Sequence, residues 1–153
     1  MKITDITATP LTTGKSLVRI HTDVGIEGWA EGPGYNKIIP SQNVVVFNAY
    51  LESVVKPVLI GEDPLQIDRH WETLAMGKDE YFYQLPASVV GVIDIALWDI
   101  LGKETGQPVY TLMGGAARKS ISLYWSVGSG WKMQPQEMLT LVQNGWDMGF
   151  RSF

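Results

Sequence analysis

One apolar helical stretch, residues 87–103, constrains the fold more than any other feature of the sequence. Its apolar residues lie on nearly every side of a helix, and only two acids, Asp94 and Asp99, interrupt the run before Lys103. A helix that is apolar all round is buried in protein or in a membrane. This stretch is too short and too often charged to span a bilayer. We therefore expect the rest of the chain to surround this helix on all sides and to bury its side chains, including that of Trp98.

The first thirty residues predict three short strands. Residues 3–10 and 16–21 are rich in β-branched side chains, and residues 26–31 follow the turn sequence Asp23-Val24-Gly25. A polar loop at residues 12–15 separates the first two strands. Tight connections of this kind join antiparallel neighbours. The segment is therefore expected to form a three-stranded antiparallel meander.

The segment between the meander and the apolar helix predicts two further helices. From Ser41 to Gly61 apolar residues recur at steps of three and four. The pair Asp63-Pro64 has the composition of a helix start, and the pattern then runs to about Gly77. A sheet followed by a helical bundle is an α+β arrangement.

A different pattern begins after Gly114-Gly115. Residues 120–127 predict a strand, residues 128–130 a loop, residues 135–148 a helix ended by Gly149, and residues 150–153 the start of another strand. Strand, helix and strand in this order form the repeating unit of parallel α/β folds. We expect residues 1–115 to form one domain and residues 116–153 to open a second that is incomplete here, because two strands and one helix cannot cover both faces of a parallel sheet.

Composition excludes several classes of protein. The chain has 153 residues, no cysteine and a net charge of −4. Without cysteine there is no disulfide framework and no thiol chemistry, and the acidic balance offers no basic surface for nucleic acid. The first residues lack the apolar core of a secretion signal. The expectation is a cytoplasmic protein with no nucleic-acid or membrane partner.

The titratable residues do not form an obvious active site. The only histidines, His21 and His70, fall in different predicted elements, and a metal site needs two or three converging ligands. Asp94 and Asp99 lie about 140° apart around a helix, so they cannot act as a carboxylate pair. An acid on so apolar a helix is costly unless it is paired, and we expect Asp94 to make a structural pair or a cap interaction.

Three loop residues are candidates for binding a small anion. Lys15 lies in the loop after the first strand, and Tyr35 and Lys37 lie in the loop after the third. They would form a polar rim over a substrate that carries a carboxylate or several hydroxyls. Solvated loop residues with no such role would give the same composition.

One long motif carries a family resemblance. Residues 91–103 read GVIDIALWDILGK and residues 106–115 read GQPVYTLMGG, and residues 28–31 read GWAE after the turn at Gly25. These segments, in this order, resemble the mandelate racemase / muconate lactonizing enzyme group of the enolase superfamily. The resemblance implies an enolase-like N-terminal capping domain at residues 1–115, followed by the truncated start of a (β/α)8 barrel at residues 116–153.

The resemblance also implies a chemistry. Such enzymes hold Mg²⁺ on three carboxylates of the barrel and remove a proton α to a substrate carboxylate with lysine or histidine bases, because the resulting enediolate needs stabilisation. A (β/α)8 barrel takes about 250 residues. No catalytic residue and no metal ligand of the family pattern maps onto this chain, so the Mg²⁺ ligands are expected to be absent from it.

The capping domain still implies a role in substrate choice. In the family two cap loops close over the barrel mouth, and they correspond here to residues 11–16 and 32–39, with residues 81–84 as a further contributor. Lys15 and Lys37 then favour an anionic substrate such as a sugar acid. We therefore expect the chain to be the N-terminal part of a Mg²⁺-dependent sugar-acid dehydratase. The 153 residues are expected to be inactive alone, and the full-length parent enzyme is expected to be a homo-oligomer. A racemase, epimerase or cycloisomerase of the same group, and a non-catalytic binding or oligomerisation module, remain open.

Overall fold

The structure is a computed structural model that describes residues 1–34, 43–76, 85–126 and 133–153. It divides into two units, residues 1–115 and residues 116–153. Among the residues described, no helix combines the length and the apolar character that crossing a membrane needs.

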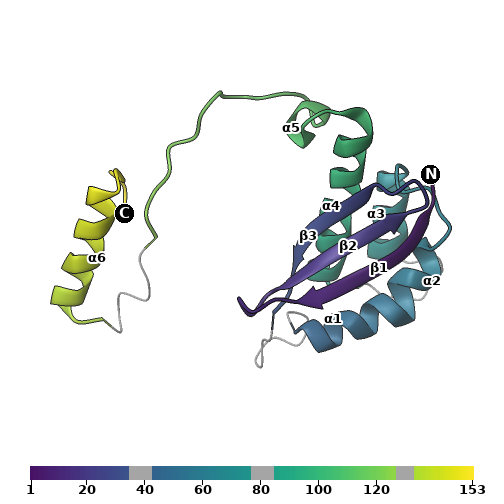
Figure 1. Cartoon of the computed structure of the whole chain (residues 1–153), viewed down its shortest axis with the longest axis horizontal. Helices are drawn as coiled ribbons and strands as arrows, with labels where there is room; N and C mark the ends of the chain where they lie inside the picture. Colours follow the sequence, from purple (N-terminus) through teal and green to yellow (C-terminus); the bar gives the residue numbers. More distant parts are fainter. Residues whose placement is uncertain (35–42, 77–84, 127–132) are drawn as a thin grey trace. The chain divides into compact units, whose positions relative to one another are not determined.

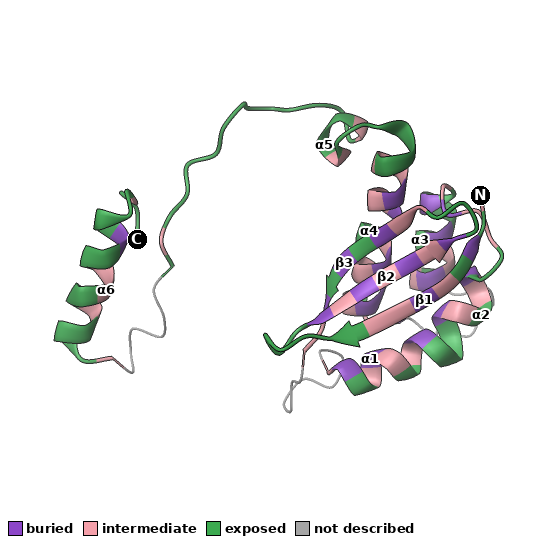
Figure 2. Cartoon of the chain, in the orientation of Figure 1, coloured by how far each residue is buried: buried purple, intermediate pink, exposed green. Residues whose placement is uncertain are grey.

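The predicted meander is confirmed. Strands β1 (Ile3–Pro10), β2 (Ser16–Thr22) and β3 (Glu27–Gly32) pair antiparallel in the order β1-β2-β3. Gly14 and Gly25 supply the positive φ angles, +82° and +81°, that the two turns require. Alternate residues of β2 are buried, among them Val18 and Ile20. One face of the sheet therefore belongs to the core and the other faces solvent (Figure 2).

The first helical segment forms one continuous rod with an irregular middle. It consists of α1 (Val44–Tyr50), the π-helical turn η2 (Leu51–Val55) and α2 (Lys56–Leu59), and it lies against β1 (Figure 1). The side chain of Asn43 caps its start by accepting from the N–H of Val45 at 2.9 Å. Pro57 has no N–H to donate to the preceding turn, which favours a wider turn at this point.

The predicted first residue of the next helix, Pro64, is wrong by three residues. Helix α3 spans Ile67–Met76, whereas Asp63-Pro64 forms a separate turn. The Asp63 carboxylate accepts from the N–H of Leu65, and its carbonyl accepts from the N–H of Gln66. An aspartate that bonds its own backbone two residues on stabilises a turn as readily as a helix start, which explains the error.

Helix α4 (Ala87–Thr105) is confirmed, and Gly106 ends it with a φ of +65°. One side of α4 packs on β3, β2 and α3, and it buries Val89, Ile93, Ala96, Leu97 and Ile100. The expectation that the helix is buried all round is wrong for the residues described. Its other side leaves Ile95 56% exposed, and Trp98 is only partly buried.

The contact between α4 and β3 explains why the motif at residues 28–31 occurs together with the distant motif at residues 91–103. A Cβ atom at Gly28 would overlap the carbonyl oxygen of Ala96, so only glycine lets the strand approach the helix this closely. The Asp99 carboxylate accepts from the N–H of Trp29 at 2.8 Å and from Lys103 Nζ at 2.6 Å. Lys103 Nζ also donates to the carbonyl oxygen of Glu27 at 2.7 Å. The first unit ends with the short helix α5 (Val109–Leu112).

The second unit contains the predicted helix but not the predicted strands. Helix α6 (Pro135–Asp147) forms, with Gln134 and Glu137 as a capping box. Residues 120–126 and 150–153 have no regular structure, and one backbone bond, from Trp125 N–H to the Ser152 carbonyl, links the two segments. Gly145 is the only buried residue described in this unit (Figure 2). A strand needs paired neighbours and a covered face, and these residues provide neither.

Candidate functional site

The hairpin between β1 and β2 holds Lys15, the only one of the three predicted binding residues that the structure describes. The turn closes through two backbone bonds, Leu11 N–H to the Lys15 carbonyl at 2.8 Å and Gly14 N–H to the Leu11 carbonyl at 3.0 Å. The backbone of Lys15 is therefore fixed at the tip of the sheet. Tyr35 and Lys37, and residues 81–84, lie outside the described residues.

The hairpin packs against the start of the loop after β3. The buried hydroxyl of Ser16 donates to the Pro33 carbonyl at 2.7 Å. A Cβ atom at Gly34 would overlap the Gly14 carbonyl, and the N–H of Val44 donates to the Gly34 carbonyl at 2.8 Å. The two loops expected to choose the substrate are therefore in direct contact where the structure describes them.

The ammonium group of Lys15 has a local partner. Its Nζ lies 3.1 Å from Oε1 of Glu31, at the end of β3, and both side chains are more than half exposed. An exposed pair of this kind contributes at most about 1 kcal/mol to stability. The pair orients Lys15 while leaving its charge accessible to an anion.

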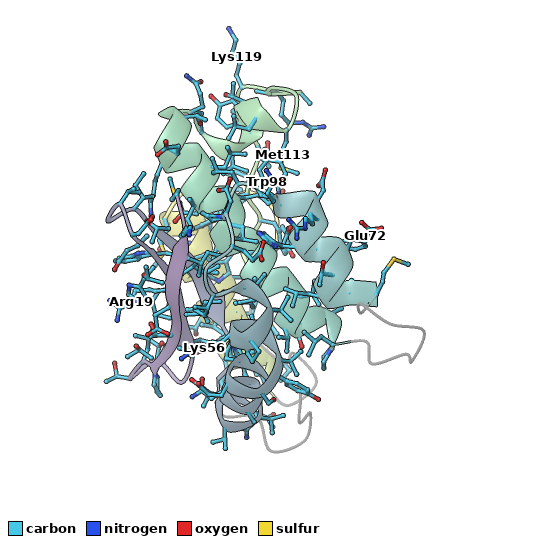
Figure 3. All side chains as sticks on the ribbon, turned by 90° about the vertical axis from the view of Figure 1, so that its right-hand side faces the viewer. Arg19, Lys56, Glu72, Trp98, Met113 and Lys119 are labelled. Atoms are coloured by element: carbon cyan, nitrogen blue, oxygen red, sulfur yellow. The ribbon has the colours of Figure 1, made fainter. Side chains whose placement is uncertain are left out.

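The two histidines have structural partners. His70 is 3% exposed, and its Nε2 donates to the Asp63 carbonyl at 2.7 Å. His21 lies on the solvent face of the sheet, with Nδ1 2.8 Å from Glu27 Oε1 and Nε2 3.2 Å from Thr7 Oγ1. The hydrogen bond from the Trp29 indole, together with the charges of His21 and Arg19, holds the pKa of Glu27 below its usual value. Figure 3 shows Arg19 on this same face, away from the helices.

The residues described do not fit a magnesium site. In residues 1–34, 43–76, 85–126 and 133–153, no three His, Cys, Asp or Glu side chains come close enough together to hold a metal ion. Magnesium requires several oxygen ligands in octahedral geometry. No step that depends on Mg²⁺ can be assigned to these residues.

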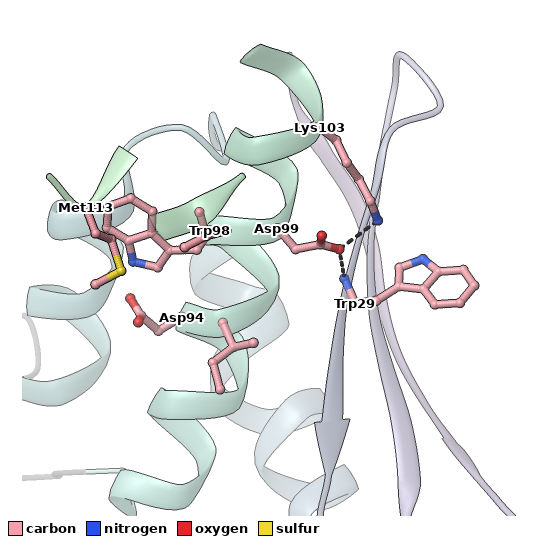
Figure 4. A pocket seen from close by; sticks show the side chains of 8 residues that line it. Trp29, Asp94, Trp98, Asp99, Lys103 and Met113 are labelled. Atoms are coloured by element: carbon pink, nitrogen blue, oxygen red, sulfur yellow. Dashed lines mark hydrogen bonds and ion pairs between the residues drawn. The ribbon is translucent and has the colours of Figure 1, made fainter. Parts of the chain in front are cut away.

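A groove of about 660 Å³ runs along the open side of α4. The sequence analysis did not predict this groove. The isolated acid Asp94 on an otherwise apolar helix could have indicated it, because a carboxylate favours a side of the helix that is not fully buried. The side chains of Ile95, Trp98, Val109 and Met113 give it an apolar lining, to which Trp29 and Lys103 also contribute. Figure 4 shows the Asp94 carboxylate beside the Trp98 ring and Met113.

The groove contradicts the expectation that Asp94 makes a structural pair. Among the residues described Asp94 makes no hydrogen bond and no ion pair, whereas Asp99 makes the bonds to Trp29 and Lys103. Burial, and then the charge of Asp68 on α3, raise the pKa of Asp94. Asp94 is therefore an acid in an apolar setting without a described partner.

Known proteins resemble both the sequence and the fold. Residues 6–114 match the family "Mandelate racemase / muconate lactonizing enzyme, N-terminal domain". A D-galactonate dehydratase family member from Streptomyces bingchenggensis is 38% identical over 135 residues, which are 87% of this chain and 30% of the relative. The D-galactonate dehydratase of Pectobacterium atrosepticum is 36% identical over 100% of this chain and 37% of its own length.

A solved structure has a similar fold. A putative dehydratase from Mesorhizobium loti superposes with a TM-score of 0.77 and 29% identity over 98% of this chain and 40% of that protein. The chain thus spans between 30% and 37% of the length of these two curated relatives. It belongs to the mandelate racemase / muconate lactonizing enzyme family of the enolase superfamily and contains that family's N-terminal capping domain.

Proposed function

We propose that this chain is the N-terminal part of a longer Mg²⁺-dependent enzyme that removes water from a sugar acid. The reaction begins with removal of the proton α to the carboxylate and ends with loss of the β-hydroxyl. The enol that results rearranges to an α-keto acid. The 153 residues alone are inactive, because the groups that bind the ion and move the proton belong to the portion of the longer protein that these residues do not include.

One observation carries this proposal: a D-galactonate dehydratase aligns with the whole chain at 36% identity. The position of Lys15 supports it. The hairpin backbone is held by Leu11 and by the contact between Gly14 and Gly34, so the backbone that carries Lys15 is preorganised. Preorganisation lowers the entropy that binding costs.

We assign Lys15, Tyr35 and Lys37 to the substrate rim of the longer enzyme. Lys15 supplies a positive charge to the carboxylate or hydroxyls of an acyclic sugar acid. Glu31 holds that charge in place while the site is empty, at the 3.1 Å contact described above. The role of this chain is therefore to select and enclose the substrate, and no proton transfer is assigned to it.

The test compares the longer protein with the 153-residue chain. With Mg²⁺ and D-galactonate, the longer protein should produce an α-keto acid and the 153-residue chain should produce none. In the longer protein, Lys15→Met should raise KM about tenfold, the equivalent of ~1.4 kcal/mol. The control is Lys2→Met, an exposed lysine at the other end of the sheet, which should leave KM unchanged.

The alternatives give different products. Exchange of the α-proton with deuterium from the solvent, without release of a keto acid, would identify a racemase or epimerase. Absence of both reactions with a panel of sugar acids would support a non-catalytic module. Turnover by the 153-residue chain itself would contradict the proposal directly.

A further inference from the structure

Strand β2 has a buried hydroxyl at each end. Ser16, its first residue, is 0% exposed and donates to the Pro33 carbonyl at 2.7 Å. Thr22, its last residue, is 8% exposed and donates to the Ile26 carbonyl at 2.6 Å. The Thr22 bond stays within the turn between β2 and β3, whereas the Ser16 bond joins two different loops. Of these two hydroxyls, Ser16 is thus the one that connects the Lys15 hairpin to the segment after β3.

The residues on either side of Pro33 suit this connection. Gly32 lies opposite Ser16 in the register of β2 and β3, and a Cβ atom at Gly32 would overlap Ser16 Oγ. Glycine at this position therefore makes room for the serine side chain. On the other side of Pro33, a Cβ atom at Gly34 would overlap the Gly14 carbonyl, so glycine there lets the segment contact the hairpin turn.

Backbone hydrogen bonds extend the connection in both directions. In the hairpin, the N–H of Gly14 donates to the Leu11 carbonyl at 3.0 Å. In the segment after β3, the Gly34 carbonyl accepts from the N–H of Val44 at 2.8 Å, at the start of α1. Loss of the serine hydroxyl would leave the Pro33 carbonyl without this donor and would loosen both sides, because a polar group that loses its partner in a buried setting is destabilised.

We propose that Ser16 is a positioning residue, whose bond to Pro33 clasps the hairpin to the segment after β3 and fixes where Lys15 stands relative to that segment. Ser16 is buried and does not touch the substrate. It acts through Lys15, its neighbour in the chain, by making the two loops a single preorganised surface, which lowers the entropy that binding costs. This inference rests on the proposed function, which assigns Lys15 to the substrate rim.

Kinetics of the longer protein test the positioning role. Ser16→Ala should raise KM for D-galactonate about fivefold and leave kcat unchanged, because it weakens binding alone. The matched control is Thr22→Ala, which removes the buried hydroxyl at the other end of the same strand and should leave KM unchanged. Lys15→Met should raise KM about tenfold in the Thr22→Ala background but less than about threefold in the Ser16→Ala background, because a lysine that is no longer held has less to lose.

Amide hydrogen exchange of the 153-residue chain tests the clasp without any activity. Ser16→Ala should speed exchange at the amides of Gly14 and Val44 about tenfold, although neither amide bonds to the serine, and should leave Gly25 unchanged. Thr22→Ala should do the opposite, because the N–H of Gly25 donates to the Thr22 carbonyl within the turn at that end. Equal exchange at Gly14 and Val44 in the native chain and in Ser16→Ala would overturn the clasp.

A second variant opens the clasp from its other side. Gly34→Ala places a methyl group against the Gly14 carbonyl and should raise KM and speed exchange at Gly14 as Ser16→Ala does, even if Ser16→Ala itself fails to fold. An unchanged KM in either variant, or a full tenfold effect of Lys15→Met in the Ser16→Ala background, would overturn the positioning role while turnover of the sugar acid upholds the proposed function. A longer protein that does not dehydrate sugar acids would refute the proposed function, and the exchange rates would still decide whether the clasp exists.

Discussion

The two sides of α4 have similar sequences and different surroundings. On the sheet side, Ile93 and Ile100 are fully buried against the strands. On the groove side, two residues from Ile93, Ile95 is 56% exposed. Both sides are rich in aliphatic and aromatic residues, so residue type alone does not distinguish them.

The difference shows that the pattern of apolar residues in a sequence indicates which side of a helix could be buried. Whether that side is buried depends on whether another element packs against it. The sheet side has a partner within residues 1–115, and its burial stabilises this unit. The groove side contributes little to that stability. Substitutions on the two sides should therefore differ in their effect on the 153-residue chain.

The largest expected effect is on the sheet side. Ile93→Ala should lower the free energy of unfolding by about 2–5 kcal/mol, because it leaves a cavity in the core. The matched substitution Ile95→Ala should change it by less than about 0.5 kcal/mol. Denaturant unfolding followed by circular dichroism measures both. Equal losses would show that the two sides of the helix are not different after all.

A smaller effect is expected where the strand meets the helix. Gly28→Ala should cost about 1–3 kcal/mol, because the new methyl group must push β3 away from the Ala96 carbonyl. Gly91→Ala, on α4 where none of the described residues places an atom within 4 Å of the new Cβ position, should stabilise the chain by about 0.5–1 kcal/mol. Thermal unfolding of the two variants would give shifts of opposite sign. A neutral Gly28→Ala variant would mean that the strand and helix are less tightly packed than described.

The smallest effect is on the groove side and depends on pH. The pKa of Asp94 is raised by burial and then by Asp68, so ionisation favours the unfolded chain. This penalty is absent below the ordinary pKa of 3.8 and is fully present above the pKa in the folded chain. Asp94→Asn should therefore stabilise the 153-residue chain at pH 7, by up to about 0.5 kcal/mol, and should have no such effect at pH 3.

A second variant separates the two causes. Asp68→Asn removes the repulsion on Asp94 but also a favourable negative charge in the first turn of α3, so its gain at pH 7 should be smaller than that of Asp94→Asn. Urea midpoints at the two pH values would measure both. A loss of stability for Asp94→Asn at pH 7 would reveal a favourable contact that the described residues do not contain.

Much of the first unit could be predicted from the sequence because its signals are local. The meander is defined by the alternation of apolar and polar residues at positions 16–22 and by the glycines of its two turns. Gly14 and Gly25 adopt the positive φ angles that these turns need. The start of α3 was missed because Asp63 bonds its own backbone in either conformation. The strands at residues 120–127 and 150–153 were predicted from composition, but a strand depends on neighbours that no local pattern supplies.

The candidate site was predictable only in part. Lys15 was predicted from its loop, but its pairing with Glu31 joins residues 16 positions apart, which no motif indicated. The α4 groove was missed for a related reason. Periodicity identified every apolar residue that lines it on α4, and burial was then assumed for all of them, although only contacts between elements decide it.

The bonds from Asp99 and Lys103 to β3 have a consequence for how the chain behaves among other proteins. β3 is an outer strand of the sheet, and its unpaired backbone groups are a ready template for another chain to add as a strand. The N–H of Trp29 and the carbonyl of Glu27 are already occupied by α4. Helix α4 therefore keeps these two groups of the β3 edge from pairing with a strand of another chain.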